Sequence, residues 1–232
     1  MKPYDLKQAR LHRRWSQPRA ALHLGVSQPY LAMLETGRRR LTPALTRRFV
    51  RRYRLPATQL LPSGNFNPQA LMNAAAVANQ LCVLGYPGFA YLASRVPRMN
   101  PGEVLLAALA QDELEPRLVE ALPWLLLRYW EMDTEWLVAD ACRFTLQNHL
   151  GFVVSLARRV SESAAVPNPA RSATLANLEA VLERARLARE STFLVNLRTD
   201  AEKQLVMQNQ SDDAKRWNLL TDWRPEHLPY AA

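Results

Sequence analysis

The chain is poor in the residues that build disulfide frameworks and metal sites. Its 232 residues include two cysteines, Cys82 and Cys142, which lie 60 positions apart and form no CxxC pair. Both are expected to be buried free thiols, as is usual in a reducing cytoplasm. The four histidines have no metal-ligand spacing, so the sequence predicts neither a metal site nor a cofactor.

Catalytic and membrane signatures are also lacking. The sequence contains no P-loop, no HExxH, no GxSxG and no GxGxxG motif, which argues against an enzyme. No apolar run approaches the roughly 18 residues of a membrane span, and residues 1–15 lack the apolar core of a signal peptide. The sequence alone therefore predicts a soluble, cytoplasmic protein without catalytic activity.

Acidic residues are scarce in the first quarter of the chain. Residues 1–62 contain 14 lysines and arginines against only Asp5 and Glu35, a net charge of +12. Residues 63–232 contain 16 lysines and arginines against 19 acidic residues, a net charge of −3. A basic region joined to a near-neutral one is typical of a protein that binds nucleic acid through one part. A solubilising excess of charge is the alternative.

Helix signals follow one another closely in this basic region. Ser16 and Ser27 have the character of N-caps, and Gly25 between them is expected to adopt positive φ in a tight turn. Thr42 followed by proline starts a further helix. Together these signals predict five short helices within residues 1–62.

The rest of the chain is also patterned as helix, which makes the expected fold class all-α. Residues 63–68 form the expected linker, residues 69–200 a larger helical bundle domain, and residues 201–232 a polar tail. The bundle is expected to contain helices near 68–84, 87–95, 101–110, 113–130, 134–164 and 172–191. Pro123 is expected to kink or split its helix, and residues 191–197 are a modest strand candidate.

Several residues at characteristic spacings carry a resemblance to a known family: Arg10, Ser16-Gln17, Ala21, Gly25-Val26-Ser27-Gln28, Leu31, Leu34-Glu35 and Gly37. Residues 1–62, about a quarter of the chain, resemble the lambda/434 repressor and Cro class of helix-turn-helix domains, also called the XRE family. The resemblance implies a five-helix DNA-binding domain whose third helix enters the major groove of double-stranded DNA.

The resemblance also implies which residues touch DNA. The expected contact residues are Gln17, Ser27, Gln28, Pro29, Tyr30, Met33, Arg38, Arg39 and Arg40. Gln17 would hold a phosphate at the start of the second helix, and Gln28 can pair with adenine through two hydrogen bonds. Pro29 departs from members that carry a polar residue there, so readout would rely more on phosphates and DNA shape. The three arginines would contact the DNA backbone.

Some of these residues have a structural interpretation instead. The resemblance implies that Arg10 and Glu35 form a largely internal ion pair, so Glu35 is expected to matter more for stability than for readout. Tyr30 and Met33 could pack within their own domain. The arginines of the fourth helix are expected to form a solvated face, and they are Arg47, Arg48, Arg51 and Arg52.

Together these features predict a sequence-specific transcriptional regulator, in the first place a repressor of its own operon. A homodimer is expected, because residues 134–164 are apolar on more than one face and one small domain makes a small DNA interface. The distal part is similar to that of some bacterial XRE-type regulators and antitoxins. The alternatives are therefore an antitoxin that neutralises a toxin partner, or a ligand-sensing or phage-defence regulator.

Overall fold

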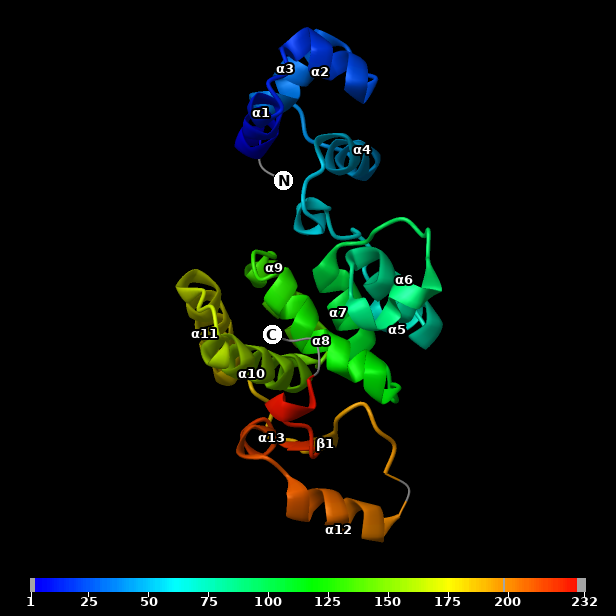
Figure 1. Ribbon diagram of the computed structural model, residues 1–232, viewed down its shortest axis with the longest axis vertical. Coiled ribbons are helices and arrows are strands. Elements are labelled where there is room, and N and C mark those ends of the chain that lie inside the picture. Colours follow the sequence, from blue (N-terminus) through cyan, green and yellow to red (C-terminus); the bar gives the residue numbers. More distant parts are fainter. Residues whose placement is uncertain (1–2, 198, 229–232) are drawn as a thin grey trace. The chain divides into compact units, whose positions relative to one another are not determined.

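The computed structural model describes residues 3–197 and 199–228, and the chain divides into two compact units (Figure 1). Unit 1 spans Met1–Asn65 and unit 2 spans Phe66–Ala232. The division lies inside the stretch expected as a linker. The described residues are mostly helical, which confirms the all-α fold class. They include two β-strands, each of two residues.

Unit 1 consists of five short helices around one apolar core, as expected. They are α1 (Pro3–His12), α2 (Gln17–Leu24), α3 (Gln28–Glu35), α4 (Pro43–Tyr53) and the 3₁₀ helix η1 (Ala57–Gln59). The most deeply buried core side chains are Leu6, Leu24, Leu31, Leu34 and Phe49. Burying side chains of this size contributes about 1.5–3 kcal/mol each, so the core holds these short helices together.

Polar caps set where the helices of unit 1 begin. The side chains of Ser16, Ser27 and Thr42 each accept a hydrogen bond from a backbone N–H in the first turn of α2, α3 and α4. A proline stands at one of the first two positions of each helix, where its missing N–H costs no hydrogen bond. These local signals explain why the helix starts follow from the sequence.

Unit 2 contains the remaining elements. They are α5 (Pro68–Leu71), α6 (Ala74–Leu84), η2 (Pro87–Leu92), α7 (Pro101–Leu109), α8 (Pro116–Arg128), α9 (Thr134–Arg143), α10 (Gln147–Ser163), α11 (Pro169–Arg184), β1 (Ser191–Thr192), α12 (Asp200–Asn209), α13 (Asp212–Arg216), β2 (Leu219–Leu220) and η3 (Pro225–His227). α10 packs against α8, α11 and α13, and every residue of α7 is buried.

Two of the helices expected in unit 2 are each divided in two. The stretch 68–84 forms α5 and α6, with Met72 and Asn73 between them. The stretch 134–164 is two helices, because the chain turns at Thr145, which has φ +57°. Pro123 was expected to kink or split its helix, and α8 runs through it without a break. The apolar faces of α10 are used inside unit 2, where Leu150, Phe152 and Val154 are fully buried. Their apolar character is therefore not evidence for a dimer surface.

Part of the expected polar tail belongs to the core of unit 2, although α12 at its start buries no residue. Trp217 is fully buried against Gly151, where a Cβ atom would lie 2.3 Å from the indole ring. β2 pairs in parallel with β1, and only the first two residues of the strand candidate 191–197 take part. The two cysteines are free but half-buried rather than fully buried.

Candidate DNA-binding surface

The turn between α2 and α3 depends on Gly25. This residue adopts φ +62° and ψ +41°, the left-handed conformation expected for it. The Arg48 guanidinium donates a hydrogen bond of 2.7 Å to the carbonyl oxygen of Leu24, at the end of α2. A Cβ atom on Gly25 would lie 2.9 Å from that guanidinium. Glycine is thus favoured by the backbone conformation, and a larger side chain would also require the Arg48 guanidinium to move.

The faces of α3 are clearly divided. Leu31, Leu34 and Glu35 are buried, whereas Gln28 and Pro29 are exposed at the start of the helix. The two remaining candidate contact residues of this helix, Tyr30 and Met33, are half-buried, and Tyr30 packs partly against the core of unit 1. The exposed face therefore begins with an amide and a proline ring.

Arg10 and Glu35 form the ion pair that the resemblance implies. Arg10 Nε lies 2.7 Å from Glu35 Oε1 and Nη2 lies 3.0 Å from Oε2, and the two side chains are 9% and 3% exposed. The third nitrogen of Arg10 donates to the carbonyl oxygen of Trp15 at 3.0 Å. The hydrogen bond to Glu35 raises the pKa of Arg10, so the pair joins α1 to α3 in its charged form.

The ion pair continues to the surface through two amides. Gln17 Nε2 donates to Glu35 Oε2 at 3.0 Å, and Gln28 Nε2 donates to Gln17 Oε1 at 2.9 Å. Arg10, Glu35, Gln17 and Gln28 thus form one hydrogen-bonded chain that begins in the core and ends on the exposed start of α3. Glu35 was expected to act mainly on stability, but this geometry also makes it a support for Gln28.

The loop after α3 presents three exposed guanidinium groups. Arg38, Arg39 and Arg40 are all exposed, and the backbone N–H of Arg39 donates to Met33 at 3.2 Å. Within the described part of unit 1, the ion pair of Arg10 is the one found, so these three arginines have no carboxylate partner. Such groups are suited to DNA phosphates.

Ser27 has a capping role in α3. Its hydroxyl oxygen accepts a hydrogen bond from the backbone N–H of Tyr30 at 3.3 Å, which leaves the hydroxyl hydrogen available to another acceptor. A role in DNA contact and a role in capping are compatible for this residue. Its place next to Gln28 makes it part of the same exposed helix start.

Sequence reasoning missed a ring stack on another part of unit 1. The rings of Trp15 and His23 are stacked with centroids 4.3 Å apart and planes at 22°. His23 is exposed and lies on the ring of Trp15. The two residues are eight positions apart, and Trp15 lies before the start of α2 whereas His23 lies within it. The periodicity of a helix therefore does not predict their contact.

A comparison with known families agrees with this geometry. A family described as a helix-turn-helix domain matches residues 5–61. Residues 5–61 are a helix-turn-helix domain. The match begins within α1 and extends past η1, and it supports a DNA-binding regulator as the general function. No curated protein and no solved structure matches the chain significantly.

Within residues 3–197 and 199–228, the helices and the side chains lack two kinds of feature. None of their helices is both long and apolar enough to cross a membrane. In the same residues, no three side chains of His, Cys, Asp or Glu come together as a metal site would require.

Proposed function

We propose that this protein is a non-enzymatic transcriptional regulator of the lambda/434 repressor and Cro type, which binds a double-stranded operator and represses its own operon. The observation that carries the proposal is the exposed amide of Gln28, held at the start of α3 by Gln17 and through it by Glu35. A side chain oriented in this way before binding loses less entropy when it pairs with a base.

The free hydrogen-bonding groups of Gln28 suit adenine. One N–H of its amide is donated to Gln17, which leaves a second N–H and the carbonyl oxygen. Adenine presents an N7 acceptor and an N6 donor in the major groove, and these match the two free groups of the amide. Pro29 and Met33 offer apolar contacts that fit a thymine methyl group.

The arginines of the loop after α3 supply affinity that does not depend on sequence. Arg38, Arg39 and Arg40 carry no compensating carboxylate, and each phosphate that they neutralise releases a counterion. Binding is therefore expected to weaken steeply with salt. Specificity would come from Gln28 and its apolar neighbours, and affinity from the guanidinium groups.

A homodimer is part of the proposal, because a single helix-turn-helix domain makes too small an interface for tight specific binding. Two domains related by a two-fold axis would read half-sites about 34 Å apart, or a multiple of that distance. Light scattering of the protein on its operator tests this directly. One chain per operator would contradict the dimer and would favour the antitoxin or ligand-sensing alternatives for unit 2.

The experiment that tests the readout begins with selection of an operator from a random duplex library. Gel shifts then compare the wild type with Gln28→Ala and Arg39→Ala. We expect Gln28→Ala to lose about 1–3 kcal/mol on the operator and to relax one base position. Arg39→Ala serves as the matched control, which should weaken binding to all sequences and lower the salt slope by about one. Unchanged specificity after Gln28→Ala would contradict the proposal.

A further inference from the structure

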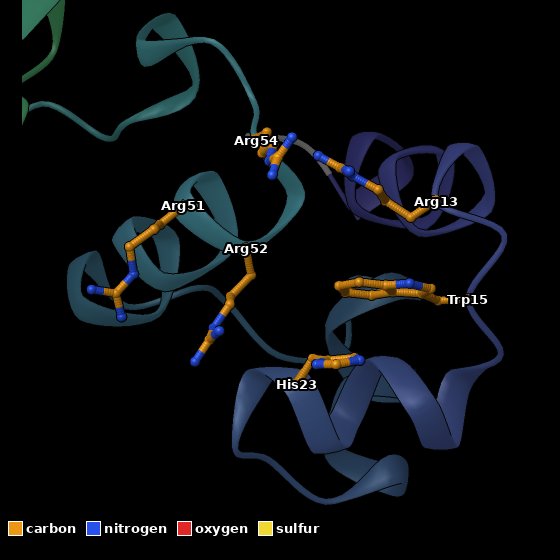
Figure 2. Close-up of a pocket in the computed structure, with 6 residues that line it drawn as sticks. All are labelled: Arg13, Trp15, His23, Arg51, Arg52 and Arg54. Carbon is orange, nitrogen blue, oxygen red and sulfur yellow. The ribbon is translucent and has the colours of Figure 1, made fainter.

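Unit 1 contains a second cationic site, which uses none of the expected DNA-contact residues. It is a pocket of about 570 Å³ lined by Arg13, Trp15, His23, Arg51, Arg52 and Arg54. These residues come from the connection between α1 and α2, the last turn of α2, the end of α4 and the residue that follows α4. Figure 2 shows the stacked rings on one side and the arginines of α4 on the other.

Every side chain that lines this pocket carries an N–H group that can donate a hydrogen bond. Trp15 and His23 stack on each other, and the edge of an aromatic ring is its positive part. The lining contains no carboxylate. Arg51, Arg52 and Arg54 form no ion pair within the described residues. The pocket is thus built for an anion.

One wall of the pocket is fixed. Arg13 donates to the carbonyl oxygen of Tyr53 through Nε at 3.1 Å and Nη2 at 2.8 Å, which ties the end of α1 to the end of α4. Tyr53 in turn packs against Trp15, with ring centroids 5.5 Å apart. The guanidinium groups of α4 therefore project beside a wall whose rings are held in place.

Arg54 occupies its position against the local backbone preference. It ends α4 with φ +53° and ψ +47°, the left-handed conformation that glycine adopts at much lower cost. Strained residues of this kind gather at binding sites, where another requirement selects the side chain. Here the side chain adds a further cation to a pocket that already holds three.

We propose that this pocket binds a small phosphate-bearing molecule with a chain of phosphate groups, as in a nucleoside triphosphate. The planar guanidinium group matches phosphate oxygens through paired hydrogen bonds, and several arginines around one hollow fit several phosphates. The volume lies within the range of small-molecule sites. The pocket uses none of the residues expected to contact DNA, and it is large enough to enclose a small molecule. Both features favour a small ligand over the backbone of the operator.

Isothermal titration of the full-length protein with sodium tripolyphosphate, adenosine triphosphate and adenosine tests the site. Both phosphate compounds are expected to bind saturably with one molecule per chain, and adenosine is expected not to bind. Stronger binding of adenosine triphosphate than of tripolyphosphate would assign the ligand as a nucleotide, and equal binding would assign the phosphate chain alone. Absence of saturable binding by either compound would overturn the proposal.

Two double variants with the same change in charge separate the pocket from the DNA surface. Arg51→Ala with Arg52→Ala should lower the affinity for tripolyphosphate at least tenfold, whereas Arg38→Ala with Arg39→Ala should change it less than twofold. All four side chains are exposed, so neither variant removes core packing. Equal losses in both variants would show a general charge effect and overturn the proposal.

Two further measurements distinguish a ligand site from a contact with the DNA backbone and from a purely structural role of Arg54. The Arg51→Ala, Arg52→Ala variant is compared with the Arg38→Ala, Arg39→Ala variant on a random DNA duplex. Equal losses of affinity for the duplex would show that the pocket arginines bind DNA, and the proposal would fail. Arg54→Gly should raise the midpoint of thermal unfolding of unit 1 and should lower the affinity for tripolyphosphate at least threefold. A loss of both stability and binding would show that Arg54 merely holds the fold.

Discussion

Unit 1 and unit 2 each bury a carboxylate against arginine, but the two networks end in different places. In unit 1, Glu35 binds Arg10 on one side and Gln17 on the other, and Gln17 accepts from Gln28 at the exposed start of α3. The network leads from the core to the candidate contact surface.

One branch of the network of unit 2 leads into the core, while its two arginines also form ion pairs with the exposed carboxylates of Glu162 and Glu183. The carboxylate of Glu179 accepts hydrogen bonds from Arg158, Arg216 and Ser155, at distances of 2.5 to 2.7 Å. The indole N–H of Trp217 donates to the Ser155 hydroxyl at 2.7 Å. These contacts join α10, α11 and α13, and the buried end of the network carries no exposed amide.

The comparison shows how one chemical device serves two purposes. A buried carboxylate holds several donors in a fixed geometry, because leaving any of its lone pairs unmatched is costly. Where the network ends at an exposed donor, these hydrogen bonds hold that side chain in one orientation for binding. Where the last donor is buried, the cost only locks helices together. Variants of the two carboxylates should therefore differ in kind as well as in size.

Glu35→Ala is expected to have the largest effect. It leaves the buried Arg10 guanidinium without its partner, which costs about 3–5 kcal/mol of the free energy of unfolding of unit 1. Hydrogen exchange of the full-length protein, read by mass spectrometry, resolves this loss to peptides of α1 to α4. Operator affinity should fall as well, because Gln17 and Gln28 lose their support. Unchanged exchange in these peptides would contradict the role of the pair.

Glu179→Ala is expected to destabilise unit 2 by less, about 2–3 kcal/mol. Arg158 and Arg216 are 26% and 35% exposed, so both can be hydrated once the carboxylate is gone. Faster hydrogen exchange should be confined to α10, α11 and α13. The intrinsic operator affinity of folded molecules should be unchanged, and a change in base preference would contradict the distinction between the two networks.

His149 is expected to make unit 2, but not unit 1, less stable in mild acid. Its ring nitrogens lie 3.3 and 3.1 Å from the carbonyl oxygens of Leu109 and Thr192, and burial lowers its pKa. The unfolded chain therefore binds the proton more readily, so stability is complete above pH of about 6.5 and declines below it.

The decline should reach at most about 1.4 kcal/mol per pH unit, since one proton is involved. Urea titrations from pH 7.5 to 5.0, followed by hydrogen exchange of α7 and α10, measure it. His149→Gln removes the titrating group and should flatten the dependence. An equally steep decline in that variant would assign it to other residues.

Tyr53→Phe is expected to have the smallest effect and the opposite sign. The hydroxyl of Tyr53 is buried and has no hydrogen-bond partner among the described residues, and burial raises its pKa. Removing an unmatched polar group while keeping the ring should leave unit 1 unchanged or more stable by up to about 1 kcal/mol. A loss above that value, measured by hydrogen exchange of α4, would reveal a partner for the hydroxyl.

The fold of unit 1 was predictable because its signals are local. Each serine or threonine cap, each proline after it, and Gly25 act within one turn of chain, and the positive φ of Gly25 is confirmed. The expected DNA contacts remain predictions, since they need DNA to be tested. The amide chain from Glu35 to Gln28 could not be read from sequence, because it depends on how α2 and α3 cross.

Unit 2 was less predictable because its decisive features are not local. The break at Thr145 has no glycine to mark it, and Pro123 is accommodated inside α8. Trp217 was assigned to a polar tail, yet its indole meets Ser155 at a separation of 62 residues. The cationic pocket of unit 1 was missed for the same reason, since α2, α4 and the connection between α1 and α2 all contribute to it.

The measurement that tests the central claim most directly is a double-mutant cycle between Gln17 and Gln28, with operator affinity as the readout. If Gln17 orients Gln28, Gln17→Ala should cost less in the Gln28→Ala background than in the wild type. The coupling is expected to be about 0.5–2 kcal/mol. Purely additive losses would show that the two amides contact DNA independently and would contradict a network that runs from the core to the DNA-binding surface.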